Sequence, residues 1–126
     1  CDGCYLHRKG AAPAAKDAPT VVLGSRGAPS HVMMGTGSVT GLSSVAHGAG
    51  RRMGRTEAYA KLKDRHTRAS LVRTALGSRV IADDAMLMYE EHPDAYKPIA
   101  PVVESLCRDG LAHRVASLVP MVTVKR

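Results

Sequence analysis

The chain has 126 residues, which is the length of one domain or of part of one. Tryptophan and phenylalanine are absent, so the core has to be built from aliphatic side chains and methionine. The formal net charge of +7 favours polyanionic partners, while the scarcity of aromatic residues argues against a stacking platform for single-stranded nucleic acid. Contacts to RNA would therefore go mainly to phosphates, and a basic domain without such a partner is the alternative.

The cysteines and the apolar segments exclude several other classes. Cys1, Cys4 and Cys107 are odd in number and include a single CxxC, which fits neither a disulfide framework nor a four-ligand zinc site. Reduced thiols in a cytoplasmic protein are expected. No apolar run has membrane-spanning length and no signal peptide is recognisable, so we expect no membrane partner. Because the chain does not begin with Met, we expect it to be the C-terminal part of a longer protein.

The first part of the chain is predicted to be rich in strands and turns. Short strands are expected at residues 5–8, 21–23 and 30–34, with a loop over 9–15. The next part is predicted to be helical. Helices are expected at 50–65, at 68–76 before the stop signal Gly77, and at 84–91 between a cap at Asp83-Asp84 and Pro93, with a short strand at 79–81.

The clearest predicted helix covers residues 97–108, with Pro98 in its first turn and Gly110 just after its end. One face of this helix is apolar at the spacing i, i+3, i+4 and i+7, and we expect it in the core: Ile99, Val102, Val103 and Leu106. A final strand follows, with a bulge or an edge at Pro120. The chain therefore divides into a strand-rich part (1–45), a helical part (50–109) and a final strand (113–125). The fold class is α+β, a mixed β-sheet with helices packed on it.

The segment from His47 to Arg51, His-Gly-Ala-Gly-Arg, is the best candidate for chemistry. Glycines let a ligand approach the main chain, and a turn that opens a helix offers unpaired N–H groups to a phosphate. A neutral imidazole beside a bound phosphorus can act as a nucleophile. Without further information, a histidine held by hydrogen bonds beside a glycine turn is the favoured alternative. We do not take His7 to be a metal ligand. We interpret His31, His66, His92 and His113, which show no partner spacing, as structural or exposed residues.

Several motifs stand in an order that resembles the RtcB family of RNA ligases. They are His7 to Ala11, Leu23 to Arg26, Ser30, Ala46 to Arg51, Ala95 to Lys97, and Lys125. The resemblance covers nearly the whole chain. Residues 75–81 and 89–91 look closest to the branch that is encoded beside a peptide release-factor-like protein.

The resemblance implies a GTP- and manganese-dependent ligase that joins RNA 3′-phosphate or 2′,3′-cyclic phosphate ends to 5′-hydroxyl ends, in RNA repair or tRNA processing. By the same resemblance His47 is the catalytic nucleophile that carries GMP. The guanylate contacts it implies are Leu23, Gly24, Ser25, Arg26, Ser30, Gly48, Ala49, Gly50 and Lys125. A release-factor-like protein encoded nearby is an expected partner, and the cytoplasm is the expected location.

The sequence also departs from the family. The metal ligands of the family lie upstream of the matched region, so we predict no metal ligand here and no ligation by this chain alone. Arg26 stands where many members have Met, which places another cation near the nucleotide. Gly54 is predicted to lie within a helix, at a cost of about 1 kcal/mol relative to alanine. The alternatives are a non-catalytic remnant that binds guanine nucleotide or RNA, and a basic structural domain.

Overall fold

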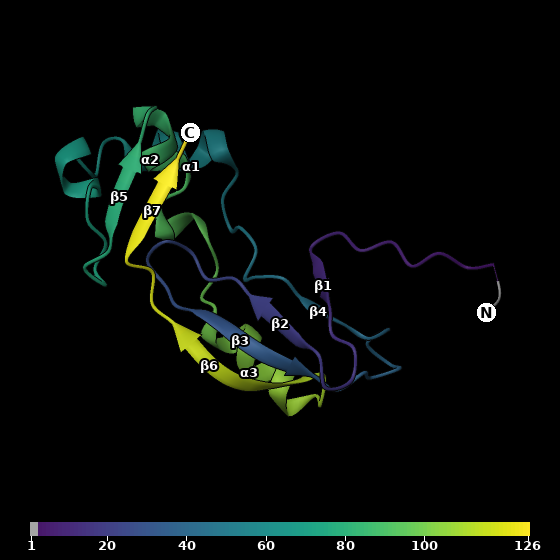
Figure 1. Ribbon diagram of the computed structural model, residues 1–126. Helices are drawn as coiled ribbons and strands as arrows, with labels where there is room; N and C mark the ends of the chain where they lie inside the picture. Colours follow the sequence, from purple (N-terminus) through teal and green to yellow (C-terminus); the bar gives the residue numbers. More distant parts are fainter. Residues whose placement is uncertain (1–2) are drawn as a thin grey trace.

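The computed structural model describes residues 3–126, and Figure 1 shows how they are arranged. Cys1, the first cysteine of the CxxC motif, lies outside the described residues. Within the described residues, the strands form three small sheets, and three α-helices accompany them. The predicted α+β class is thus confirmed. The strands are divided among separate sheets, two antiparallel and one parallel, rather than joined in one.

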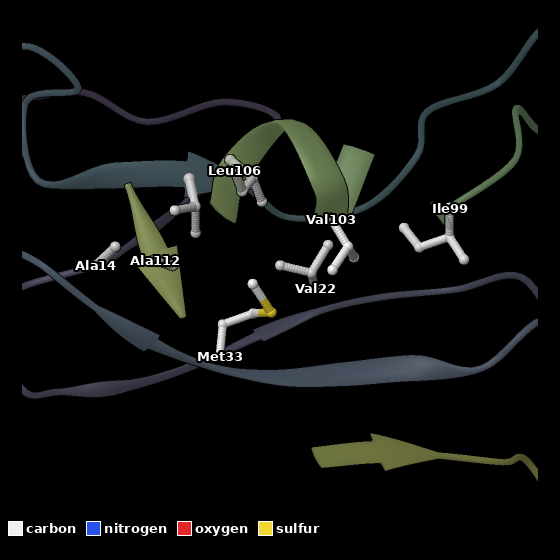
Figure 2. Close-up of a cluster of buried hydrophobic side chains, with 8 residues drawn as sticks. Ala14, Val22, Met33, Ile99, Val103, Leu106 and Ala112 are labelled. Atoms are coloured by element: carbon white, nitrogen blue, oxygen red, sulfur yellow. The ribbon is translucent and has the colours of Figure 1, made fainter. Parts of the chain in front are cut away.

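The largest sheet contains three antiparallel strands in the order β2 (Pro19–Val22), β3 (Ser30–Gly35) and β6 (Ala112–Leu118). Burial alternates along β2 and β3, as expected for strands that cover a core with one face. Helix α3 (Ala100–Arg108) packs on that face, and Figure 2 shows its side chains above those of the strands. The buried core consists of Ala14, Val22, Met33, Val45, Ile99, Val103, Leu106 and Ala112.

Two smaller sheets flank this core. β1 (Ala11–Pro13) pairs with β4 (Ser44–Ala46) in antiparallel orientation, and β5 (Arg79–Ala82) pairs with β7 (Val122–Lys125) in parallel orientation. Figure 1 shows β5 and β7 beside the short helices and away from α3. Those helices are α1 (Arg55–Leu62), α2 (Ala85–Glu90) and two 3₁₀ turns, η1 (Arg68–Leu71) and η2 (Pro93–Ala95).

The short helices are held by two hydrophobic clusters of their own. The first contains Ala58, Leu62 and Ala95, and the second contains Leu71, Val80 and Met88. Both clusters are small, but they fix the segment that runs from α2 to Tyr96. That segment supplies one wall of the candidate site described below.

Helix α3 confirms the apolar pattern predicted for it, because Ile99, Val103 and Leu106 are buried and Val102 packs against the same core. Gly110 follows the helix in the left-handed region, with φ +67, where a glycine is favoured. The predicted start is wrong. The helix begins at Ala100 with Pro101 in its first turn, and Pro98 precedes it.

Several other predicted elements need correction. Residues 5–8 form no strand. Strand β1 lies inside the predicted loop, and β4 was not predicted. The helix expected at 50–65 begins only at Arg55, because Gly50 has φ +74 and Gly54 is the extended N-cap residue. Gly54 therefore does not carry the cost of a glycine within a helix.

Two further elements are shorter than predicted. The helix expected at 68–76 is a single 3₁₀ turn, Arg68–Leu71. The predicted final strand is interrupted around Pro120, so that β6 and β7 enter different sheets. This interruption carries the end of the chain from the main sheet to the short helices and brings Lys125 to the candidate site. No helix within residues 3–126 has the length and apolar character needed to cross a membrane.

Candidate functional site

A cavity of about 430 Å³ lies where the loops after β2 and β4 meet β7. This volume is in the range of sites that bind small molecules. The structure brings every residue of the predicted site to this cavity: His47, Leu23, Gly24, Ser25, Arg26, Ser30, Gly48, Ala49, Gly50 and Lys125. Their roles remain predictions. The cavity is also lined by residues outside the predicted site, namely Arg51, Glu91, Tyr96, Pro120 and Thr123.

The ends of β2 and β4 are held side by side by main-chain contacts. Leu23 and Gly48 form a parallel bridge, and the Leu23 amide donates to the carbonyl of His47 at 2.8 Å. A Cβ atom at Gly48 would lie 2.9 Å from the carbonyl oxygen of Leu23, which is closer than such contacts allow. Glycine at this position therefore permits the two segments to approach each other and places His47 at the cavity.

His47 is exposed, and its imidazole makes no hydrogen bond to any residue within 3–126. Its main-chain amide donates to the carbonyl of Gly10 at 3.3 Å, which fixes the backbone of this exposed residue at the cavity. The alternative of a ring satisfied by neighbouring protein groups is not what this geometry shows. Gly50, with φ +74, then turns the chain toward α1, and its carbonyl accepts a hydrogen bond from the Lys97 amide.

The loop from Leu23 to Ser30 closes tightly on itself. The Gly24 amide donates to the hydroxyl of Ser30 at 3.1 Å, and the Gly27 amide donates to that of Ser25 at 3.3 Å. A Cβ atom at Gly24 would lie 2.1 Å from the carbonyl oxygen of Pro29. Because Ser30 accepts from the loop, its own hydroxyl proton remains available to a ligand.

Arg26 lies in the wall of the cavity and is only 8% exposed. Its Nη2 donates to the carbonyl of Met88 at 2.5 Å, while Nε and Nη1 are buried without a hydrogen-bond partner among the described residues. Burial lowers the pKa of Arg26, and the charges of Glu91 and Tyr96 act in the opposite direction. The sequence predicted a cation near the nucleotide, but this guanidinium faces the interior of the wall.

Glu91 is the centre of a polar network that sequence reasoning missed. Its carboxylate accepts hydrogen bonds from the hydroxyl of Tyr96 and from Nη1 of Arg51, the latter at 3.2 Å. The Nζ atom of Lys125 lies 3.9 Å from the same carboxylate, and Nε of Arg55 lies 3.7 Å from it. Glu91 therefore holds the cation predicted to contact the nucleotide, and no motif spacing revealed this role.

This network makes the stability of the fold sensitive to acid. Burial raises the pKa of Glu91, but the Tyr96 hydrogen bond and the charges of Lys125, Arg51 and Arg55 outweigh it, so the pKa lies below its ordinary value of 4.5. A lowered pKa means that Glu91 contributes stability above pH 4.5, and this contribution is lost as the pH falls through the lowered value. We expect the free energy of unfolding in urea to fall over this range, and Glu91→Gln to flatten the dependence.

Glu104→Gln, on the exposed side of α3, is the matched control for this measurement. It removes one carboxylate without touching the cavity and should leave the pH profile of the wild-type chain in place. An acid profile of Glu91→Gln that coincides with that of the wild type would contradict the role assigned to Glu91.

Of the remaining histidines, His7 and His113 are exposed, and the other three have partners. His31 is buried and its Nδ1 lies 2.9 Å from the hydroxyl of Ser117, which fits the structural role predicted for it. His66 and His92 were expected to have no partner, and this is wrong. Their rings stack with centroids 4.5 Å apart, and the carboxylate of Asp94 lies beside them.

Comparison with known proteins gives a consistent result. The family model described as tRNA-splicing ligase RtcB matches residues 2–126. The chain is 45% identical over 121 residues to an RNA-splicing ligase RtcB2 of Escherichia coli, covering 96% of this chain and 32% of that relative. It is 36% identical over 124 residues to an RNA-splicing ligase RtcB of Mycobacterium tuberculosis, covering 96% of this chain and 28% of that relative.

An archaeal relative, the tRNA-splicing ligase RtcB of Archaeoglobus fulgidus, is 34% identical over 135 residues, which cover 95% of this chain and 28% of the relative. The chain thus spans about a third of the length of the curated relatives that it matches.

Proposed function

The chain belongs to the RtcB family, and on this basis we propose that it is the guanylate-binding part of a GTP-dependent RNA ligase. The proposed reaction joins an RNA 3′-phosphate or 2′,3′-cyclic phosphate end to a 5′-hydroxyl end, as in RNA repair or tRNA processing. The observation that carries the proposal is the gathering of every predicted guanylate residue, and of His47, around one cavity.

In the proposed reaction a ring nitrogen of His47 attacks the α-phosphorus of GTP. An N–P bond forms, the bond to the bridging oxygen breaks, and pyrophosphate leaves. The RNA 3′-phosphate, which a 2′,3′-cyclic phosphate yields when water breaks its bond to the 2′-oxygen, then takes GMP from the imidazole. The 5′-hydroxyl attacks this activated phosphorus, losing its proton to solvent, and GMP is released as the phosphodiester forms. Covalent catalysis of this kind divides a difficult step into easier ones, because the phosphate alone carries no good leaving group.

The cavity suits a guanylate in several respects. Gly50 leaves the main chain at the cavity accessible to a phosphate, since a Cβ atom there would meet no atom of the described chain within 4 Å. Ser30 can donate its hydroxyl proton. Lys125 brings a positive charge, and its Nζ atom is positioned by the ion pair with the carboxylate of Glu91. The arrangement thus combines a nucleophile, hydrogen-bond donors and a cation within one site of nucleotide size.

The cavity does not suit manganese by itself. Among its lining residues within the described chain, His47 and Glu91 are the only side chains of the kinds that ligate this metal, and Glu91 is already engaged by Tyr96 and several cations. The metal, which would neutralise charge on phosphate oxygens, is therefore expected on residues outside this chain. Ligation by the chain alone is accordingly not expected. The cytoplasmic location and the release-factor-like partner stay predictions from the resemblance.

A non-catalytic guanylate-binding remnant is the second candidate, and it is favoured by Arg26, which stands where many members of the family have Met and is buried in the cavity wall. Both candidates require the cavity to bind guanylate. We expect GMP to raise the melting temperature of the chain and to bind saturably in calorimetry, with AMP binding more weakly. Lys125→Ala should lower the affinity for GMP by about tenfold, since a charge-assisted hydrogen bond contributes about 1.5–3 kcal/mol.

The matched control is Lys61→Ala, which removes an equal charge from an exposed pair with Glu57 on α1. This variant should bind GMP like the wild type. Binding that does not distinguish GMP from AMP, and that responds equally to both substitutions, would reject the guanylate site and leave a basic domain with diffuse affinity for anions.

A further inference from the structure

Two more cavities are connected to the guanylate cavity through shared arginines, one directly and the other through the first. The second cavity, of about 270 Å³, is lined by Arg26, which also lines the first. The third, of about 480 Å³, is lined by Arg73, which also lines the second. Arg68 and Arg79 line the third cavity as well. The three cavities are therefore linked in series by shared arginines, and positive charge accompanies them.

We propose that the second and third cavities form a phosphodiester track, a binding site for the backbone phosphates of an RNA strand whose end lies in the guanylate cavity. The track is defined by Arg68, Arg73 and Arg79 together with the imidazoles of His66 and His92. It adds a binding site to the proposed function and rests on the RNA substrate proposed there.

The arginines of the track lack the partners that surface arginines usually find. Arg68 and Arg79 make no side-chain hydrogen bond or ion pair with any residue within 3–126. Arg73 makes one long hydrogen bond, from Nη1 to the carbonyl of Gly77 at 3.4 Å. Arg73 and Arg79 moreover stand opposite each other in an antiparallel bridge, where like charges are destabilising. A bound polyanion removes this repulsion.

The second cavity favours an anion over a metal ion. His66, His92 and Asp94 bring three potential ligand atoms within 4.8 Å of one another. However, Nδ1 of His92 accepts a hydrogen bond from the main-chain amide of Asp94 at 3.1 Å, so a neutral ring carries its proton on Nε2. That nitrogen is then a donor, which suits a phosphate oxygen and not a metal.

The surrounding charge supports the same choice. Arg26 and Arg73 line the second cavity, and Asp94 is the one acidic side chain among its lining residues in the part of the chain that the structure describes. In the third cavity the lining residues include no acidic side chain within the described chain. Arg26 is buried with two unpartnered nitrogens, and an anion bound in the adjacent cavity would offset its charge at short range. Phosphates spaced along a strand match charges that are spaced along successive cavities.

The test is the salt dependence of RNA binding to the 126-residue chain. A fluorescein-labelled 12-nucleotide RNA with a 3′-phosphate is titrated at several salt concentrations and followed by anisotropy. Arg73→Gln/Arg79→Gln should weaken binding by about tenfold in 50 mM salt. It should also reduce the slope of log K against log salt by roughly 1.4, which corresponds to two lost phosphate contacts with a single strand. Arg73 and Arg79 are exposed, so this double variant should keep the circular dichroism spectrum of the wild type.

Arg114→Gln/Arg108→Gln is the control, because it removes two exposed arginines from β6 and α3, away from the three cavities. It should change the affinity less than twofold. Equal losses in the two double variants would mean diffuse electrostatic attraction and would overturn the track, as would the absence of RNA binding.

Two further measurements separate this proposal from others. In one outcome, pyrophosphate displaces the RNA at the same concentration at which pyrophosphate binds by itself, and the affinity for RNA does not depend on RNA length. This outcome would assign the site to free phosphate and overturn the RNA track. An affinity for RNA that rises as the RNA is lengthened from 3 to 12 nucleotides would support the track. If Arg73→Gln/Arg79→Gln weakens RNA binding but the chain does not bind GMP, the track is supported and the guanylate site is rejected. If the chain binds GMP but the double variant binds RNA like the wild type, the guanylate site is supported and the track is rejected.

Discussion

Replacing His47 with alanine should abolish covalent transfer of GMP to the protein when the remaining part of a ligase is supplied. The experiment uses a chimera in which this chain replaces the matching 121-residue segment of the E. coli relative. With manganese and GTP labelled at the α-phosphate, we expect a labelled protein band and ligation of RNA ends. Because the imidazole nitrogen is the atom proposed to form the N–P bond, His47→Ala should reduce both signals by about 10³-fold or more.

His113→Ala is the matched control, since it removes an exposed imidazole on β6 far from the cavity in the fold. It should label like the unmodified chimera. A chimera that binds GMP but never acquires the label would identify this copy as a non-catalytic remnant. A label that survives His47→Ala would place the nucleophile elsewhere and remove the central assignment of the proposal.

The parts of the fold that the sequence predicted well are those set by local patterns. Helix α3 could be predicted because its apolar residues recur at a spacing that places them on one face of a helix. The end of the helix could be predicted because Gly110 readily adopts the left-handed backbone found there. The strand β3 alternates as expected between buried and intermediate residues. These features depend on neighbours within a few residues, which a single sequence contains.

The parts that were missed depend on distant partners. Strand β1 is short, ends in Pro13 and exists because it pairs with β4, more than thirty residues later. The predicted strand at 5–8 has strand-like residues but no such partner. The sequence around Gly54 predicts a helix, and the structure shows that Gly54 is instead the N-cap residue with an extended backbone.

The candidate site shows the same division. The residues around the cavity could be gathered from motifs, because the resemblance places them in register. The environment of each residue could not be predicted from these motifs. Arg26 contacts Met88 across 62 positions, and Arg51 contacts Glu91 across 40. The burial of one guanidinium and the role of one carboxylate arise from packing between segments that have no common motif.

The second large effect is expected from Gly24→Ala. The added Cβ atom would lie 2.1 Å from the carbonyl oxygen of Pro29 and 2.7 Å from that of Ala28, and both are main-chain atoms that cannot move aside as a flexible side chain would. The loop has to open, which breaks the hydrogen bond from the Gly24 amide to Ser30. We expect a loss of about 1–3 kcal/mol in the free energy of unfolding, as in other overpacked sites.

The same substitution should also remove most of the affinity for GMP, because Ser30 is displaced together with the backbone of Arg26. Gly54→Ala is the matched control: its Cβ atom meets nothing within 4 Å, and its backbone is extended with φ −61. It should destabilise the chain by less than about 1 kcal/mol, as a weaker N-cap, and leave GMP binding intact. If Gly24→Ala unfolds at the urea concentration of the wild type and binds GMP equally well, the closed loop is not what positions the guanylate contacts, and Leu23 to Ser30 would have to be removed from the site.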